Sequence, residues 1–158
     1  MSLRKNRVFA MPKLRSRLIR DAAGQASLEL ALVLPVFLFL FTGIFAFAIA
    51  YNNDIVLTEA VGAGGQYLQV IRTNTTDPCA DTLTAIKGAA PSLNSSNISL
   101  TITMNGVAQS GTSCSGAQTN LVAGSPVTVK ATYPCKLPIY GMTFPTCTLA
   151  AQVTEYEY

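Results

Sequence analysis

The sequence predicts an α+β protein with a long N-terminal helix, a short second helix and a small antiparallel β-sheet. Residues 30–50 form an uncharged apolar run, and helical spacing of apolar residues continues from there to about Arg72. The last third of the chain instead alternates apolar and polar residues, as half-buried strands do. We therefore expect residues 25–72 to be one helix and residues 73–158 to be one small α+β domain.

Residues 1–24 are a strongly basic leader. They contain seven lysines or arginines and one acid, a net charge of +6, whereas residues 25–158 carry a net charge of −3. High charge and weak apolar periodicity predict that residues 1–20 are disordered in water. The positive-inside rule places this leader in the cytoplasm and the chain from Tyr51 onward across the membrane. Nucleic-acid binding is not expected, because the arginines lack interleaved aromatic residues.

The uncharged run at residues 30–50 is long enough to cross a membrane. At a rise of about 1.5 Å per residue, a helix of this length spans roughly 30 Å, the thickness of the bilayer hydrocarbon. The helix is expected to begin near Ala26, with Asp21 or Ser27 as its N-cap. Pro35 removes a backbone donor inside the run, which predicts a kink there.

Beyond Ala50 the predicted helix becomes amphipathic and carries a cluster of glycines. Gly62, Gly64 and Gly65 each disfavour helix by about 1 kcal/mol relative to alanine, so a bend or a close backbone contact is plausible here. Close packing against a neighbouring subunit is one interpretation of these glycines. Local flexibility is the other.

The C-terminal domain is predicted from turn and alternation signals. Asp77 and Pro78 are suited to the N-cap and first turn of a short helix, which is expected from Ala80 to about Ala89. Asn105-Gly106 is a strong two-residue hairpin signal. The expected strands are residues 98–104, a short return strand from Val107, residues 127–133 and residues 148–156, and residues 110–125 read as a loop.

The four cysteines all lie on the side that is predicted to be exported. An even number of cysteines in an oxidising compartment favours two disulfides over free buried thiols. Cys135 ends one predicted strand and Cys147 begins the last, so their sulfurs meet if these strands are antiparallel neighbours. Of the three possible connectivities we therefore predict Cys135 with Cys147 and Cys79 with Cys114.

The residues needed for common catalytic chemistry are missing from the sequence. There is no histidine, no CxxC spacing and no glycine-rich phosphate loop after a strand. These absences argue against histidine-based acid–base catalysis, against a zinc site and against nucleotide binding. Neither an enzyme activity nor a cofactor is expected.

The stretch GQASLELALVLPVFLFLFTGIF, from Gly24 onward, carries a processing signal. A basic leader, a glycine, four residues, the acid Glu29 and then an apolar helix follow one another in the order typical of type IV pilin-like proteins. The stretch resembles the TadE-like family, pseudopilins of the tight-adherence (Flp) pilus of bacteria. The resemblance implies a pilin-like fold, insertion in the inner membrane, and cleavage after Gly24 by a prepilin peptidase that leaves Gln25 as the new N-terminus.

The resemblance also implies partners and a role for Glu29. Its partners would be other pilin subunits, contacted through the N-terminal helix, the pilus assembly platform and inner-membrane lipid. Glu29 would pair with the N-terminal amine of the adjacent subunit, since opposite charges in an apolar setting cost less together than apart. The alternative is a Glu29 that stays solvated among lipid headgroups and only favours the helix N-terminus.

Two other functions fit the sequence less well. One is a secreted, disulfide-containing envelope binding domain with a signal peptide cleaved at Ala46-Phe47-Ala48 or Ala48-Ile49-Ala50. Its apolar region would exceed the usual 7–15 residues of a signal peptide. The other is an uncleaved membrane-anchored envelope protein. The mature N-terminus distinguishes the three, at Gln25, at or near Ile49 or Tyr51, or at Met1.

Overall fold

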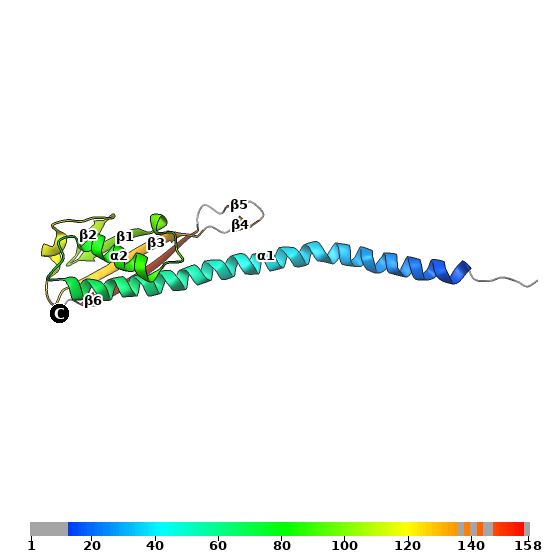
Figure 1. Cartoon of the computed structure of the whole chain (residues 1–158), viewed down its shortest axis with the longest axis horizontal. Helices are drawn as coiled ribbons and strands as arrows, with labels where there is room; N and C mark the ends of the chain where they lie inside the picture. The colour runs from blue at the N-terminus through cyan, green and yellow to red at the C-terminus, as the bar shows by residue number, and fades with distance from the viewer. Residues whose placement is uncertain (1–12, 136–137, 140–141, 144–146, 157–158) are drawn as a thin grey trace, which may run out of the picture. The chain divides into compact units, whose positions relative to one another are not determined.

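The computed structural model describes residues 13–135, 138–139, 142–143 and 147–156, with side chains from residue 24 to 135 and from 147 to 156. The chain divides into two compact units, Met1–Gly43 and Ile44–Tyr158. A long apolar helix is followed by a short helix and a four-stranded antiparallel sheet (Figure 1). The predicted α+β class is confirmed.

Helix α1, Lys13–Ile71, is 59 residues long and begins earlier than the sequence suggested. Residues 13–20 are helical, so the expectation that they are disordered is wrong for this part; residues 1–12 lie outside the described residues. Leucine and arginine, which recur here, favour helix, and extending an existing helix avoids the cost of nucleation. Asp21 and Ser27 consequently lie inside α1, and neither is its N-cap.

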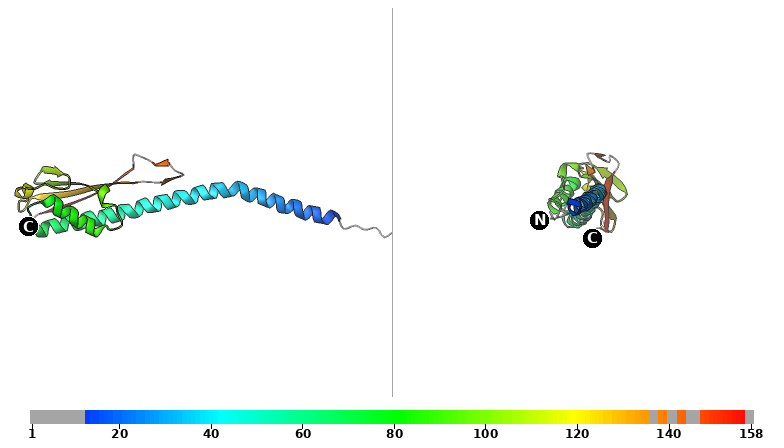
Figure 2. Two further views of the ribbon diagram at one scale, coloured as in Figure 1. Left: turned by 45° about the horizontal axis from the view of Figure 1, so that its top comes forward. Right: turned by 90° about the vertical axis from the view of Figure 1, so that its right-hand side faces the viewer.

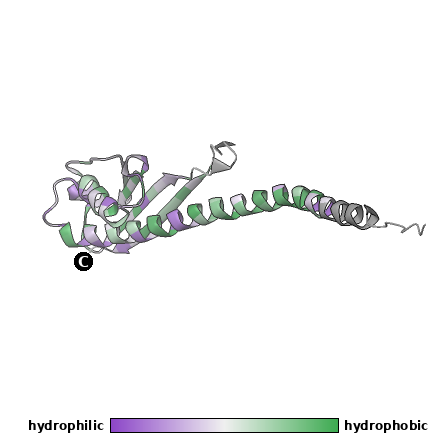
Figure 3. Cartoon of the chain, turned by 45° about the vertical axis from the view of Figure 1, so that its right-hand side comes forward, coloured by the Kyte–Doolittle hydropathy of each residue, from purple (hydrophilic) through white to green (hydrophobic). Residues whose placement is uncertain are grey.

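The apolar part of α1 displays its side chains instead of burying them. Among the described residues, one stretch, Gly24–Ile71, is long and apolar enough to cross a membrane, and its most apolar window is only 6% buried. Figure 3 shows this part of the helix coloured mostly as hydrophobic. Pro35 lies within α1, which continues on both sides of it. The kink at Pro35 stays a prediction.

Helix α2, Pro78–Ala89, confirms the predicted short helix and begins two residues earlier than expected. Asp77 caps it, because its carboxylate accepts a hydrogen bond of 3.1 Å from the backbone N–H of Ala80. Proline fits the first turn, where its missing N–H leaves no intrahelical bond unmade.

The main sheet has the order β2-β1-β3-β6, and every neighbouring pair in it is antiparallel. Asn105 and Gly106 both have positive φ, 47° and 80°, so the predicted hairpin turn is confirmed and has the backbone of a type I′ turn. The strands of the main sheet are β1 (Ser99–Met104), β2 (Val107–Ser110), β3 (Pro126–Pro134) and β6 (Thr148–Tyr156).

Four short elements lie in segments that were expected to be loops or to lack regular structure. β4 and β5 form a two-residue antiparallel pair between Cys135 and Cys147, and two 3₁₀ turns lie outside the main sheet. Elements of two to four residues are too short to show a hydrophobic period. They are β4 (Pro138–Ile139), β5 (Met142–Thr143), η1 (Ser95–Asn97) and η2 (Ala117–Asn120).

The core of the second unit lies between the sheet and the two helices that cover one of its faces (Figure 2). Alternate residues of β1 and β3 point into it, as the alternation in the sequence predicted. The opposite face is rich in threonine and serine, and the hydroxyls of Thr128 and Thr154 lie 2.9 Å apart on it. The largest fully buried side chains of the core include Leu57, Val61, Leu68, Ile86, Ile102, Met104, Val127 and Val129.

The glycines of α1 allow this close packing, and the contacts are with the same chain. A Cβ on Gly64 would lie 2.6 Å from Cγ1 of Ile86 in α2, and one on Gly65 would lie 2.8 Å from Cγ1 of Val153 in β6. Around Gly62 the space is open. The interpretation of close packing against a neighbouring subunit is therefore wrong for Gly64 and Gly65, and α1 continues through the cluster without a break.

Candidate functional site

The predicted processing residues lie in the interior of α1. Gly24 and Gln25 are 11 and 12 residues after Lys13, the first residue of the helix, and both are exposed. A Cβ placed on Gly24 would meet no atom within 4 Å. The helix surface at the peptide bond between them is therefore open to solvent. The backbone there is helical and does not belong to a disordered leader.

Glu29 lies one helical turn after Gln25, and positions four residues apart share a face of an α-helix. It is exposed, and it makes no hydrogen bond or ion pair with any residue whose side chain is described. Its large neighbours Leu28 and Leu30 are 68% and 63% exposed. The site is thus a single carboxylate on a helix surface that is otherwise apolar.

The helix surface that follows Glu29 has no charged residue until Asp54. Within residues 30–50 the one polar side chain is that of Thr42, whose hydroxyl donates a 2.8 Å hydrogen bond to the backbone carbonyl of Leu38. Phe37 and Phe41 contact each other edge to face, with ring centroids 4.6 Å apart. A continuous apolar surface of this extent marks a membrane or protein contact.

The structure joins Cys79 to Cys114 and Cys135 to Cys147, the two pairs predicted from the sequence. The second bond closes the end of the β3–β6 ladder, where the backbone N–H of Cys135 also donates a 2.9 Å hydrogen bond to the carbonyl of Cys147. The first ties the start of α2 to the segment after β2. No cysteine in the chain is free.

Asp77 has a second role that the sequence did not reveal. Besides capping α2, its carboxylate accepts a 2.8 Å hydrogen bond from the backbone N–H of Cys114 and hydrogen bonds from the hydroxyls of Ser113 and Ser115. These donors, the Cys114 N–H first, lower the pKa of Asp77 to about 2. The sequence signal that could have revealed this role is the order Asp77-Pro78-Cys79 together with the serines on both sides of Cys114, the disulfide partner of Cys79.

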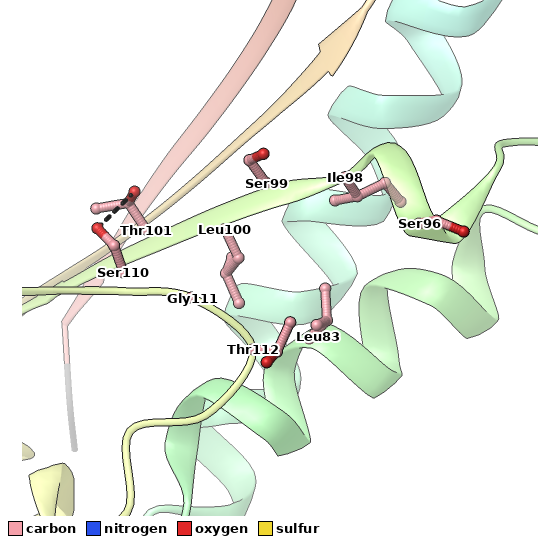
Figure 4. A pocket seen from close by; sticks show the side chains of 9 residues that line it. All are labelled: Leu83, Ser96, Ile98, Ser99, Leu100, Thr101, Ser110, Gly111 and Thr112. Atoms are coloured by element: carbon pink, nitrogen blue, oxygen red, sulfur yellow. Dashed lines mark hydrogen bonds between the residues drawn. The ribbon is translucent and has the colours of Figure 1, made fainter.

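Two of the hollows in the second unit are lined by residues that the structure describes. One, of about 420 Å³, lies beside the start of β1, and Figure 4 shows the hydroxyls of Thr101 and Ser110 pointing toward each other there, 3.2 Å apart. None of its lining residues is charged, so we assign it no function. The other, of about 310 Å³, lies between α1 and the start of β6. Among the described residues no three histidine, cysteine or acidic side chains are grouped so as to hold a metal ion.

Comparison with known proteins gives one match. The model of the TadE-like protein family matches residues 24–66, from the predicted processing glycine to the amphipathic part of α1. The C-terminal sheet lies outside this match. No characterised protein and no solved structure matches the chain.

Proposed function

We propose that this chain, whose residues 24–66 match the TadE-like protein family, is a TadE-like pseudopilin or minor pilin of the Tad pilus system. It is inserted in the bacterial inner membrane, is processed after Gly24 by a prepilin peptidase, and takes part in the assembly or initiation of an adhesive Flp-type pilus. The TadE-like family is a pilin-type structural family, and an enzyme activity is not part of the proposal. The observation that carries it is a family match that begins at Gly24 and continues along an exposed apolar helix.

The exposed side chains of α1 support membrane insertion. Fully burying one leucine or phenylalanine is worth about 1.5–3 kcal/mol, and most large side chains between residues 28 and 49 are more than 40% exposed. Water is thus a poor environment for this segment, and a bilayer or a bundle of identical helices is a good one. The net charge of +6 before Gln25 favours a leader that stays in the cytoplasm.

An extracytoplasmic C-terminal domain is supported by the disulfides. Both bonds lie after the apolar run, and disulfides persist mainly in oxidising compartments. This topology agrees with the one that the basic leader favours, although the two arguments rest on different residues.

Processing requires a local change in α1. The peptide bond after Gly24 lies within the helix, where backbone N–H and C=O groups are hydrogen-bonded to each other. A peptidase that binds the backbone on both sides of this bond must unwind it. Glycine costs about 1 kcal/mol in a helix relative to alanine, so Gly24 makes unwinding easiest at the bond to be cut. Cleavage would remove the net charge of +6 that holds the helix at the cytoplasmic face.

The N-terminus of the mature protein tests the proposal. Chain purified from membranes or pili should begin at Gln25 when its N-terminal peptide is identified by mass spectrometry. A start near Ile49 or Tyr51 would instead support a secreted binding domain. A start at Met1 would support an uncleaved membrane-anchored protein. In either of these cases the pilin proposal would be wrong.

A further inference from the structure

The groove between α1 and β6 combines an apolar wall with a single acid. Four residues of one face of α1, at positions 47, 50, 51 and 54, line one side of it, and the start of β6 lines the other. The Cys135–Cys147 disulfide lies beside them. All of these residues belong to the second unit, Ile44–Tyr158. The residues that line the groove are Phe47, Ala50, Tyr51, Asp54, Cys135, Cys147, Thr148, Leu149 and Ala150.

The polarity of the groove changes along α1. Phe47 and Ala50 belong to the uncharged run, and Phe47 is 70% exposed. Tyr51 follows, with a phenol that suits the membrane–water boundary. Asp54, one turn further, is the first charged residue after the run. With the membrane insertion proposed above and a run that ends at Ala50, the apolar end of the groove would lie at the hydrocarbon and the acidic end at the headgroups.

Asp54 is half-buried, and its carboxylate has no hydrogen-bond or ion-pair partner among the described residues. Only its backbone carbonyl is engaged, by the hydroxyl of Thr58 at 2.9 Å. A partly desolvated carboxylate favours a cationic donor. The occupant that the groove fits thus has an apolar part at the level of Phe47 and a cation about 10 Å further along the helix axis, at the level of Asp54.

We propose that the groove binds a phospholipid with an amine headgroup, its ammonium on Asp54 and the upper part of an acyl chain against Phe47 and Ala50. The inference rests on the membrane insertion proposed above and adds a headgroup preference to it. Tyr51 also lines the groove, between these two ends along α1, and its exposed aromatic ring is a further partner for the same ammonium.

Lipid retention measures this preference. The full chain is reconstituted into nanodiscs of equal parts phosphatidylethanolamine and phosphatidylglycerol, and the lipids that remain bound are identified by native mass spectrometry. We expect roughly tenfold more retained phosphatidylethanolamine than phosphatidylglycerol, the discrimination typical of one charge-assisted hydrogen bond. Asp54→Asn should remove the preference. Glu59→Gln, which neutralises an exposed acid of α1 outside the groove, should keep it.

Three results would overturn the inference while leaving membrane insertion intact. The first is equal retention of the two lipids, and the second is an unchanged preference in Asp54→Asn. The third is a dimer that forms in place of bound lipid and is abolished by Asp54→Asn. This last result would make a second copy of the chain the occupant of the groove. A chain that does not enter nanodiscs at all would contradict membrane insertion, and this inference with it.

Discussion

At the scale of single residues, two acids have opposite surroundings. Asp77 accepts hydrogen bonds from the N–H groups of Ala80 and Cys114 and from two serine hydroxyls. Glu29 lies on an apolar helix surface without such a partner among the described side chains. The first carboxylate therefore stabilises the fold of its own chain, whereas the second is available to another molecule.

Neutralising Asp77 should weaken the second unit in a pH-dependent way. Its folded pKa of about 2 lies below the ordinary value for aspartate, so its stabilisation is complete above about pH 4 and is lost as the pH falls toward 2. Asp77→Asn should lower the melting temperature at neutral pH and flatten this acid dependence. Circular dichroism of the full chain in detergent measures both, with Glu59→Gln, which removes an exposed acid outside this hydrogen-bond network, as the charge-matched control. Equal effects of the two substitutions would contradict the assignment.

Replacing Glu29 should separate processing from assembly. If the carboxylate pairs with the N-terminal amine of an adjacent subunit, Glu29→Gln leaves that amine unpaired among apolar helices, while the signal at Gly24 is intact. Normal membrane insertion and cleavage are expected, with incorporation into pili reduced at least tenfold, a change of about 1.4 kcal/mol in assembly free energy. Quantitative immunoblots of membrane and pilus fractions measure this.

Glu59→Gln provides the control for Glu29→Gln, since it removes an exposed acid from the same helix beyond the apolar run. Its incorporation should match that of the wild type. Processed Glu29→Gln protein that enters pili at the normal level would show that Glu29 has no pairing role, and would favour a solvated acid near the headgroups.

At the scale of elements, the glycines of α1 determine how closely the helix lies to its neighbours. Gly64→Ala should destabilise the second unit by on the order of 1 kcal/mol. The close contact of the new methyl group with Ile86 destabilises the fold by about 1–3 kcal/mol, whereas the higher helix propensity of alanine stabilises it by about 1 kcal/mol. Gly62→Ala, in open space, should stabilise it by up to about 1 kcal/mol. Urea unfolding of both variants gives the comparison. Stabilisation by both would mean that Ile86 moves aside easily.

Elements with a strong local signal were the ones predictable from sequence. The α2 cap, the Asn105-Gly106 turn and the last strand follow from a few adjacent residues, and the structure confirms them. The start of α1 was misjudged because charge alone suggested disorder, whereas helix can extend from an adjoining apolar segment. The surfaces that pack on Gly64 and Gly65 could not be predicted, because a glycine in a sequence does not indicate which surface approaches it.

At the scale of the whole molecule, composition and charge predicted the apolar helix, whereas contacts between distant residues other than the two disulfides could not be predicted. An uncharged run after a basic leader predicted the apolar helix, and the family match over residues 24–66 confirms the resemblance read from the same stretch. The groove beside β6 could not be predicted, since Asp54 and Leu149 are 95 positions apart and no local pattern relates them. The donors to Asp77 were missed for the same reason.

The two disulfides also limit how far this chain can stretch under load. They enclose sequence separations of 35 and 12 residues, and a fully extended chain covers at most about 3.3–3.6 Å per residue. A pull between the two ends of an unfolded chain therefore bypasses both loops and yields about 160 Å less extension than the same chain would give after reduction. A subunit whose sheet gives way under tension would reach its full length early and then bear force through covalent bonds.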